Sequence, residues 1–173
     1  MKILLGSFAY LFAIALIAPA YAGEQYVDKT GYAVSGYDVV SYYSIKQSAI
    51  GQLQRSPLPG KKSITVKFNN ATWAFATEQN RDLFLKNPTK YVPAYDGHCA
   101  YGNAQGYKVP ANPKLWRIVD GRLYLNIRRS VFNRWHRDIS GYINKGDNNW
   151  GRLQSTPASN NSVPELNASR API

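Results

Sequence analysis

The segment from residue 73 to residue 91 constrains the fold of this chain more than any other. Its first residues, Trp-Ala-Phe-Ala, are typical of a strand end, and Thr77 follows as a favoured helix N-cap with Glu78 in the first turn. Asn87 then caps a second turn with Pro88 at its first position, where a missing N–H costs nothing. The sequence therefore predicts a strand, a short helix and a further helical turn in immediate succession.

Two β-hairpins are predicted along the chain. In the first, apolar and polar residues alternate over 64–68, an Asn-Asn pair at 69–70 can turn the chain, and a second strand follows at 72–76. The second hairpin spans 116–125, where two alternating runs flank an Asp-Gly pair. Asp-Gly suits a tight turn because both turn residues need positive φ values.

A last helix is predicted after the second hairpin, with Ser130 as its N-cap and Gly146 as its C-terminal stop. Within it Arg134 can pair with Asp138 one turn on. Apolar residues recur there at helical spacing and form one face: Val131, Phe132, Trp135, Ile139, Tyr142 and Ile143. Residues 44–60 carry two glycines and two prolines and are predicted to be a loop. The expected fold class is α+β: a small antiparallel sheet built from two hairpins and packed against two to three helices, in a single domain.

The first 22 residues have the composition of a secretory leader. Lys2 gives a positive start, an apolar run follows, and an Ala-Tyr-Ala sequence ending at Ala22 fits a cleavage site. An uncleaved anchor is the alternative, but Pro19 closes the run short of the about 20 residues that a spanning helix needs. We therefore predict a periplasmic or secreted bacterial protein with no transmembrane anchor after processing. Its expected parts are a signal peptide at 1–22, a domain at 23–150 and a disordered tail at 151–173.

The chain carries a net charge of +11, or +10 once Lys2 is removed. This balance favours anionic partners such as phospholipid headgroups, lipopolysaccharide or acidic glycans of the cell envelope. A solvated basic surface that serves solubility is the alternative. Export argues against nucleic acid as a partner. The basic residues gather in two regions: Lys61, Lys62 and Lys67 in the first, and Arg117, Arg122, Arg128, Arg129, Arg134 and Arg137 in the second.

Cys99 is the only cysteine, so no internal disulfide can form. The thiol is therefore buried and inert, linked to another molecule, or reactive. One thiolate with His98 and His136 would make a plausible zinc or copper site. Adjacent residues such as His98 and Cys99 diverge on a strand or helix, however, and converge only in an irregular loop. The alternative is that His98 is an exposed loop residue and His136 flanks the core.

Several motifs together resemble the YHS domain, a small module often linked to metal handling. Beyond residues 73–91, the segment 36–43 (Gly-Tyr-Asp-Val-Val-Ser-Tyr-Tyr) looks like a family element, and 95–101 (Tyr-Asp-Gly-His-Cys-Ala-Tyr) is similar to one in the exported subgroup. The resemblance covers roughly residues 36–150. It places family cysteines at positions that here hold Ser41, Ala76 and Asn80, which are poor ligands for soft metals or, for alanine, none. The resemblance therefore implies the family scaffold without its metal-site cysteines.

These observations lead us to expect an exported, non-catalytic binding or accessory module of the YHS type, with an unknown ligand and no cofactor. Its expected ligand site consists of Tyr37, Asp38, His98, Cys99 and Tyr101. Three alternatives stay open: a transition-metal protein using Cys99 with His98 and His136, an interaction protein for anionic envelope surfaces, and a thiol-dependent enzyme. The enzyme would need a cation or a helix N-terminus that lowers the pKa of the thiol.

Overall fold

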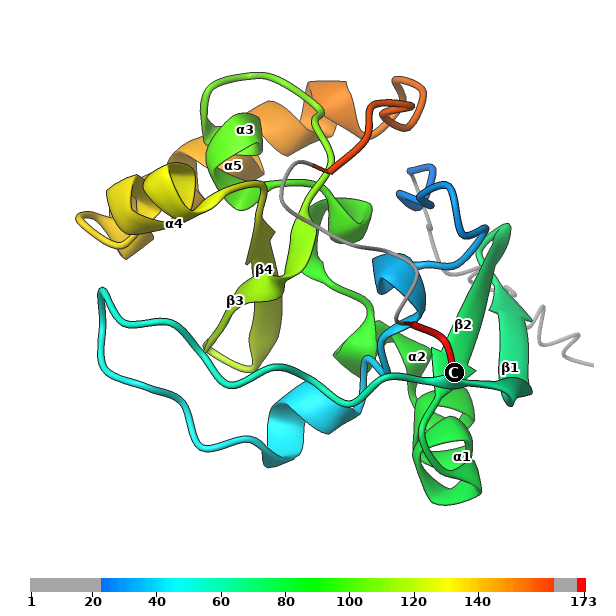
Figure 1. The fold of residues 1–173 in the computed structure, drawn as a ribbon. Coiled ribbons are helices and arrows are strands. Elements are labelled where there is room, and N and C mark those ends of the chain that lie inside the picture. The colour runs from blue at the N-terminus through cyan, green and yellow to red at the C-terminus, as the bar shows by residue number, and fades with distance from the viewer. Residues whose placement is uncertain (1–22, 164–170) are drawn as a thin grey trace, which may run out of the picture.

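The first hairpin lies where the sequence predicts it. A computed structural model of the protein describes residues 23–163 and 171–173. In it, strand β1 (Lys61–Phe68) pairs antiparallel with β2 (Ala71–Phe75), on the right in Figure 1. Asn69 and Asn70 form the turn with φ values of 49° and 57°, a left-handed conformation that asparagine tolerates. The Asn-Asn pair thus sets the register of this hairpin.

The second hairpin is also confirmed, but the two hairpins do not join into one sheet. Strand β3 (Asn112–Val119) pairs antiparallel with β4 (Arg122–Asn126) around a turn at Asp120 and Gly121. Each hairpin forms a separate two-stranded sheet, and among the described residues no ladder connects them. Aromatic side chains pack between the hairpins instead. The predicted α+β single-domain fold is therefore confirmed, with two small sheets where one was expected.

The helical segment after the first hairpin follows its capping signals. Helix α1 (Glu78–Lys86) begins after Thr77, whose side chain accepts a hydrogen bond from the Asn80 N–H. Helix α2 (Pro88–Tyr91) begins after Asn87, whose side chain accepts from the Lys90 N–H. A 3-10 turn, η3 (Ala94–Gly97), leads into α3 (Ala100–Ala104). Two further 3-10 turns precede β1: η1 (Val34–Gly36) and η2 (Ser41–Ser44). The segment from 45 to 60 is a loop, as predicted.

The predicted last helix is wrong in its bounds, because two helices occupy the segment. Helix α4 (Arg129–Trp135) begins one residue before Ser130, and α5 (Ile139–Leu153) follows a turn. The break lies at Asp138. Its carboxylate caps α5 by accepting from the Gly141 N–H at 2.9 Å, in place of the predicted pairing with Arg134. Gly146 is no stop: it lies inside α5, where a Cβ atom would be 2.5 Å from the Tyr95 hydroxyl.

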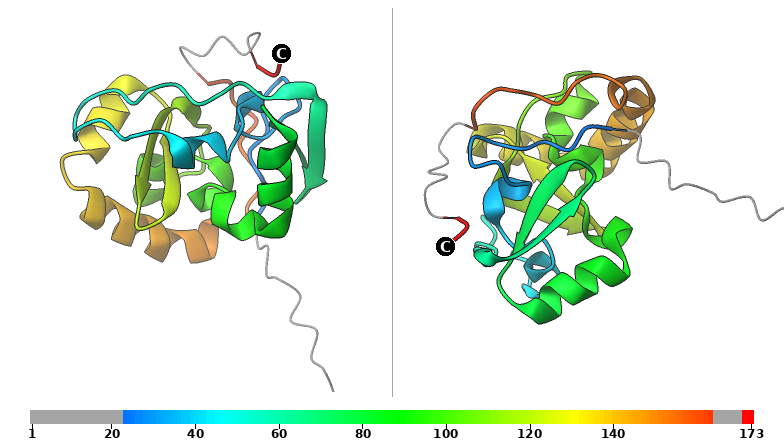
Figure 2. Two further views of the ribbon diagram at one scale, coloured as in Figure 1. Left: turned by 90° about the horizontal axis from the view of Figure 1, so that it is seen from below. Right: turned by 90° about the vertical axis from the view of Figure 1, so that its right-hand side faces the viewer.

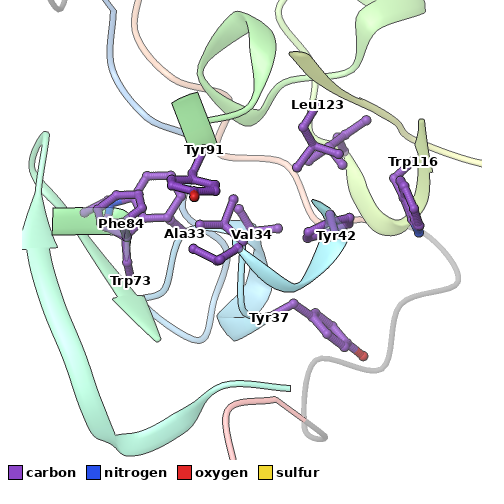
Figure 3. Packing of buried hydrophobic residues seen from close by; sticks show 14 of the residues in the cluster. Ala33, Val34, Tyr37, Tyr42, Trp73, Phe84, Tyr91, Trp116 and Leu123 are labelled. Atoms are coloured by element: carbon purple, nitrogen blue, oxygen red, sulfur yellow. The ribbon is translucent and has the colours of Figure 1, made fainter. Parts of the chain in front are cut away.

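Aromatic side chains fill the core between the hairpins. Phe84 of α1 is fully buried, with ring centroids 5.1 Å from Trp73 and 5.2 Å from Phe75. Tyr42 packs edge-on against Trp116 at 5.1 Å, which links the first part of the core to the second hairpin (Figure 3). A second hydrophobic cluster packs α4 and α5 against β4. Its buried residues are Ala94, Tyr95, Ala100, Tyr124 and Trp135. Figure 1 shows α3, α4 and α5 gathered on one side of the second hairpin.

The predicted leader at 1–22 lies outside the described residues, whereas part of the predicted tail is described. The predicted boundary at 150 falls inside α5, and Leu153 is buried. Residues 154–163 then run back along the domain, and the Asn161 carbonyl accepts from the Tyr26 hydroxyl at 3.1 Å. Hydrogen bonds join these residues to the N-terminal lead-in, and the disorder of the tail stays a prediction. In the part of the chain that the structure describes, no helix is both long and apolar enough to span a bilayer.

Candidate functional site

Asp38 forms the centre of a buried hydrogen-bond cluster between η2, β2 and α1. Its side chain is fully buried. One carboxylate oxygen accepts from the Val40 N–H at 2.9 Å and the Ser41 N–H at 3.3 Å. The other accepts from the Ala76 N–H at 2.8 Å and the Asn80 amide at 2.7 Å. All four donors are neutral N–H groups, so both side-chain oxygens of Asp38 have hydrogen-bond partners without a cation.

The positions at which the YHS resemblance would place cysteines surround this same carboxylate. Each of the three residues contributes a donor to Asp38, although Ser41 lies in η2, Ala76 in the turn after β2 and Asn80 in α1. The Ser41 hydroxyl donates to the Asp38 carbonyl at 2.7 Å and accepts from the Leu58 N–H at 3.0 Å. In this chain the convergence serves hydrogen bonding and ties the lead-in to the first hairpin and α1.

Cys99 is buried, and its environment disfavours a thiolate. The residue is the N-cap of α3, and its sulfur accepts from the Gly102 N–H at 3.4 Å. The residue is fully buried, and burial raises the pKa of the thiol to about 11, although hydrogen bonds from the backbone and the charge of Arg128 act in the opposite direction. The chemistry expected of Cys99 is therefore that of a small apolar side chain with weak hydrogen bonds to Gly102 and Asn126.

We expect Cys99 to react with a thiol reagent at pH 8 more than about 100-fold more slowly in the folded protein than in the urea-unfolded chain. Both burial and the raised pKa reduce the thiolate available to the reagent. A stopped-flow measurement with a chromogenic disulfide gives both rates. Folded and unfolded rates within tenfold of each other would revive the thiol-enzyme alternative.

His98 is buried, whereas the alternative to a metal site predicted that it is an exposed loop residue. Its Nδ1 lies 2.9 Å from the Tyr95 carbonyl oxygen, so Nδ1 carries the proton. Its Nε2 accepts from the Ser159 N–H at 3.1 Å. Burial lowers the pKa of His98 to about 4. Both ring nitrogens are thus occupied by backbone partners in the neutral form, and neither is free for a metal ion.

His136 lies at the end of α4, far along the chain from Cys99. Its Nδ1 accepts from the Gly51 N–H at 3.2 Å, which joins α4 to the 45–60 loop. Burial, with the nearby Arg117 and Arg129, lowers the pKa of His136 to about 4. Within residues 23–163 and 171–173, no group of three or more histidine, cysteine or acidic side chains is arranged to hold a metal ion. Each of the three predicted metal ligands thus contacts a different set of partners. These residues are His98, Cys99 and His136.

The predicted ligand set is also divided. Cys99 and Tyr101 come together through Asn126, whose side-chain oxygen accepts from the Tyr101 N–H at 3.3 Å and lies 3.7 Å from the Cys99 sulfur. Asp38 belongs to the separate cluster described above. Tyr37 lies at the edge of the core with its hydroxyl pointing away from the other labelled side chains (Figure 3). Only Tyr101 of the set contributes a partly exposed ring to a basic surface.

That surface is a cation–aromatic patch built by α3, α4 and α5, which we define as Tyr101, Arg134, Tyr142 and Lys145. The two tyrosine rings pack 5.0 Å apart. The Arg134 guanidinium lies 5.8 Å from the Tyr101 ring centroid, and the Lys145 amine lies 5.7 Å from that of Tyr142. Tyr142 and Lys145 are one turn apart on α5, so the same helix face presents a ring and a charge.

In the described part of the chain, the cations of the patch have no carboxylate partner. Among the described residues, salt bridges involve only the arginines Arg81 and Arg122. The Tyr101 hydroxyl raises the pKa of Arg134, to which it is hydrogen-bonded at 3.5 Å. Rings with adjacent unpaired cations can stack on a flat or sugar-like group while binding its anion. The helical spacing predicted Tyr142 on an apolar face but gave Lys145 no role. A basic residue one turn after an amphipathic tyrosine was the signal that could have identified it.

Comparison with protein-family models, with curated proteins and with solved structures finds no match.

Proposed function

We propose that this protein is an exported, non-catalytic binding module of the YHS type that attaches to anionic components of the cell envelope. The observation that carries the proposal is the cation–aromatic patch, in which Arg134 and Lys145 are exposed and have no carboxylate partner among the residues that the structure describes. The chain's net charge of +11 adds long-range attraction to anionic surfaces.

The side chains that could have been catalytic are engaged in structural contacts instead, which supports a binding role. The Cys99 thiol is buried with a raised pKa, and both nitrogens of His98 are engaged by the backbone. Asp38 is likewise engaged by buried donors. These side chains hold the fold together, whereas Arg134 and Lys145 of the patch are exposed, beside tyrosine rings that pack against the core.

The YHS assignment stays a proposal that rests on the sequence motifs. It gains support from the convergence of Ser41, Ala76 and Asn80 on one buried carboxylate, since motif positions distant in sequence meet at one point.

The proposal predicts that Arg134→Gln with Lys145→Gln weakens binding to anionic surfaces about tenfold or more, because each basic residue near such a surface contributes about 1 kcal/mol. Binding is measured by co-sedimentation with phosphatidylcholine vesicles containing phosphatidylglycerol, and by titration with a soluble acidic polysaccharide, at two salt concentrations.

A matched control removes the same charge elsewhere. Lys61→Gln with Lys62→Gln changes two exposed lysines of β1, so both double variants have the same net charge. The control variant is expected to lose about twofold in affinity, because only the long-range attraction from the net charge is reduced. Equal losses in both double variants would show that net charge, not the patch, carries the binding. No salt-sensitive binding to either surface would reject the proposed function.

A further inference from the structure

The 45–60 loop exposes large aliphatic side chains at its tip, which we define as residues 48–54. Ile50 is 62% exposed and Leu53 is 54% exposed. Three of the seven large hydrophobic residues that are exposed in the described chain belong to this one loop, the third being Leu58. Single exposed aliphatic residues are ordinary on a protein surface, but a group in one projecting loop indicates an interaction site.

The tip is held in place by side chains from the body of the protein. The Ser48 carbonyl accepts from the Arg117 guanidinium at 3.1 Å, and the Gly51 carbonyl accepts from Arg129 at 3.1 Å. The Gly51 N–H donates to His136 at 3.2 Å, as described above. These bonds fix the backbone on either side of Ile50. The aliphatic side chains are therefore presented outward in a set conformation, which lowers the entropy cost of binding.

Three more hydrogen bonds complete this support. Gln47 pairs with the backbone of Ile118, donating to its carbonyl at 3.1 Å and accepting from its N–H at 2.8 Å. The Gln54 side chain accepts from the Ser48 N–H at 2.8 Å across the base of the tip. The left view of Figure 2 shows the loop running along the molecule from β1 to α4.

The charges around the tip favour an anionic partner. Arg117 and Arg129 lie beneath it, and Lys46 and Arg55 flank it in the sequence and are exposed. Two carboxylates, those of Asp120 and Asp138, line the hollow beside Ile50, whose apolar walls include Val119, Ile139 and Ile143. The cations outnumber these acids, and Arg137 also lines the hollow.

We propose that the 48–54 tip inserts Ile50 and Leu53 into the interfacial region of an anionic lipid bilayer. Aliphatic side chains that enter the headgroup boundary, with basic residues around them, bind by apolar burial and by attraction to anionic lipid together. The inference rests on the proposed function and narrows its anionic partner to a lipid surface. The tip is joined through Arg129 and His136 to α4, the helix that also carries Arg134.

The first test measures binding of Ile50→Ser with Leu53→Ser to vesicles of phosphatidylcholine and phosphatidylglycerol. The protein is used as isolated from its host, with the N-terminus of every variant determined by mass spectrometry. We expect partitioning to fall about tenfold, because two aliphatic side chains no longer enter the bilayer. The control, Leu83→Ser with Leu85→Ser, changes two exposed leucines of α1 (41% and 52% exposed) and is expected to bind within about twofold of the parent.

The second test places an environment-sensitive fluorophore on Ile50→Cys or, as control, on Leu85→Cys. The native thiol is buried, so only the introduced cysteine reacts readily. Vesicles should shift the emission of the probe at 50 to the blue and leave the probe at 85 unchanged. This readout also holds if the serine variant proves unstable.

The outcomes separate the two proposals. Binding to anionic vesicles that is unaffected in the serine variant, with no shift at position 50, overturns insertion and leaves charge-driven attachment. Binding to the acidic polysaccharide without binding to vesicles overturns the lipid assignment alone. A shift at 50 produced by a protein partner but not by vesicles also overturns it. Binding to neither anionic surface rejects both proposals.

Discussion

Replacing Asp38 by alanine is expected to destabilise the protein by about 3 to 5 kcal/mol and to lower Tm by about 10 °C. The substitution leaves the N–H groups of Val40, which is buried, and Ala76, which is partly buried, without their acceptor. Asn80 loses the same partner but can turn towards solvent because it is only half-buried. Urea unfolding, followed by circular dichroism, gives the free energy of unfolding for each variant.

Two comparisons separate the cluster from the loss of a negative charge. Asp38→Asn keeps the size of the side chain but turns an amide towards donors, so we expect a loss of about 2 to 3 kcal/mol. Asp82→Asn removes an exposed carboxylate that pairs with Arg81 at 2.9 Å and should cost less than about 1 kcal/mol. If Asp38→Ala cost no more than Asp82→Asn, the buried cluster would not be holding η2, β2 and α1 together.

Lowering the pH from 7 to 4.5 is expected to remove about 2 to 3 kcal/mol of stability through His98 alone. The pKa of this histidine falls from its ordinary 6.5 to about 4 because it is buried. The unfolded chain therefore binds a proton between these values that the folded protein does not. The contribution of His98 is complete above pH 6.5 and is lost progressively as the pH falls towards 4. Protonation would place an N–H against the Ser159 N–H that now donates to Nε2.

The variant His98→Gln isolates this effect from the carboxylates that titrate over the same range. Gln does not titrate, so the difference in unfolding free energy between parent and variant should shrink by about 2 to 3 kcal/mol between pH 7 and pH 4.5. A difference that is the same at both pH values would show that the His98 ring is accessible to solvent and protonates freely. The same measurement on His136→Gln reports the second lowered pKa.

Local signals were enough to predict the hairpins and the first two helices. Asn69, Asn70, Asp120 and Gly121 have the positive φ values that their residue types favour, and Thr77 caps α1 as expected. The break between α4 and α5 was missed because Asp138 fits equally well as an ion-pair partner of Arg134 or as an N-cap. Only the tertiary setting of α5, where Gly146 packs on Tyr95, decides between these roles.

The candidate site was harder to predict because its residues depend on which sides of three helices meet. Cys99 and His98 attracted attention as chemically rare residues, yet each is buried among backbone partners. The patch instead joins Tyr101 to Tyr142 and Lys145 of α5. A period of 3.6 residues identifies an apolar face but does not say which tyrosines at its edge lie next to a second helix.

The most direct test of a binding role for the cation–aromatic patch is hydrogen exchange measured with and without phosphatidylglycerol-containing vesicles. We expect slower exchange in α3 and in the 134–146 segment, where Tyr101, Arg134, Tyr142 and Lys145 lie, with the β1–β2 hairpin unchanged. Protection centred on the β1–β2 hairpin, with α3 and residues 134–146 unaffected, would contradict the account.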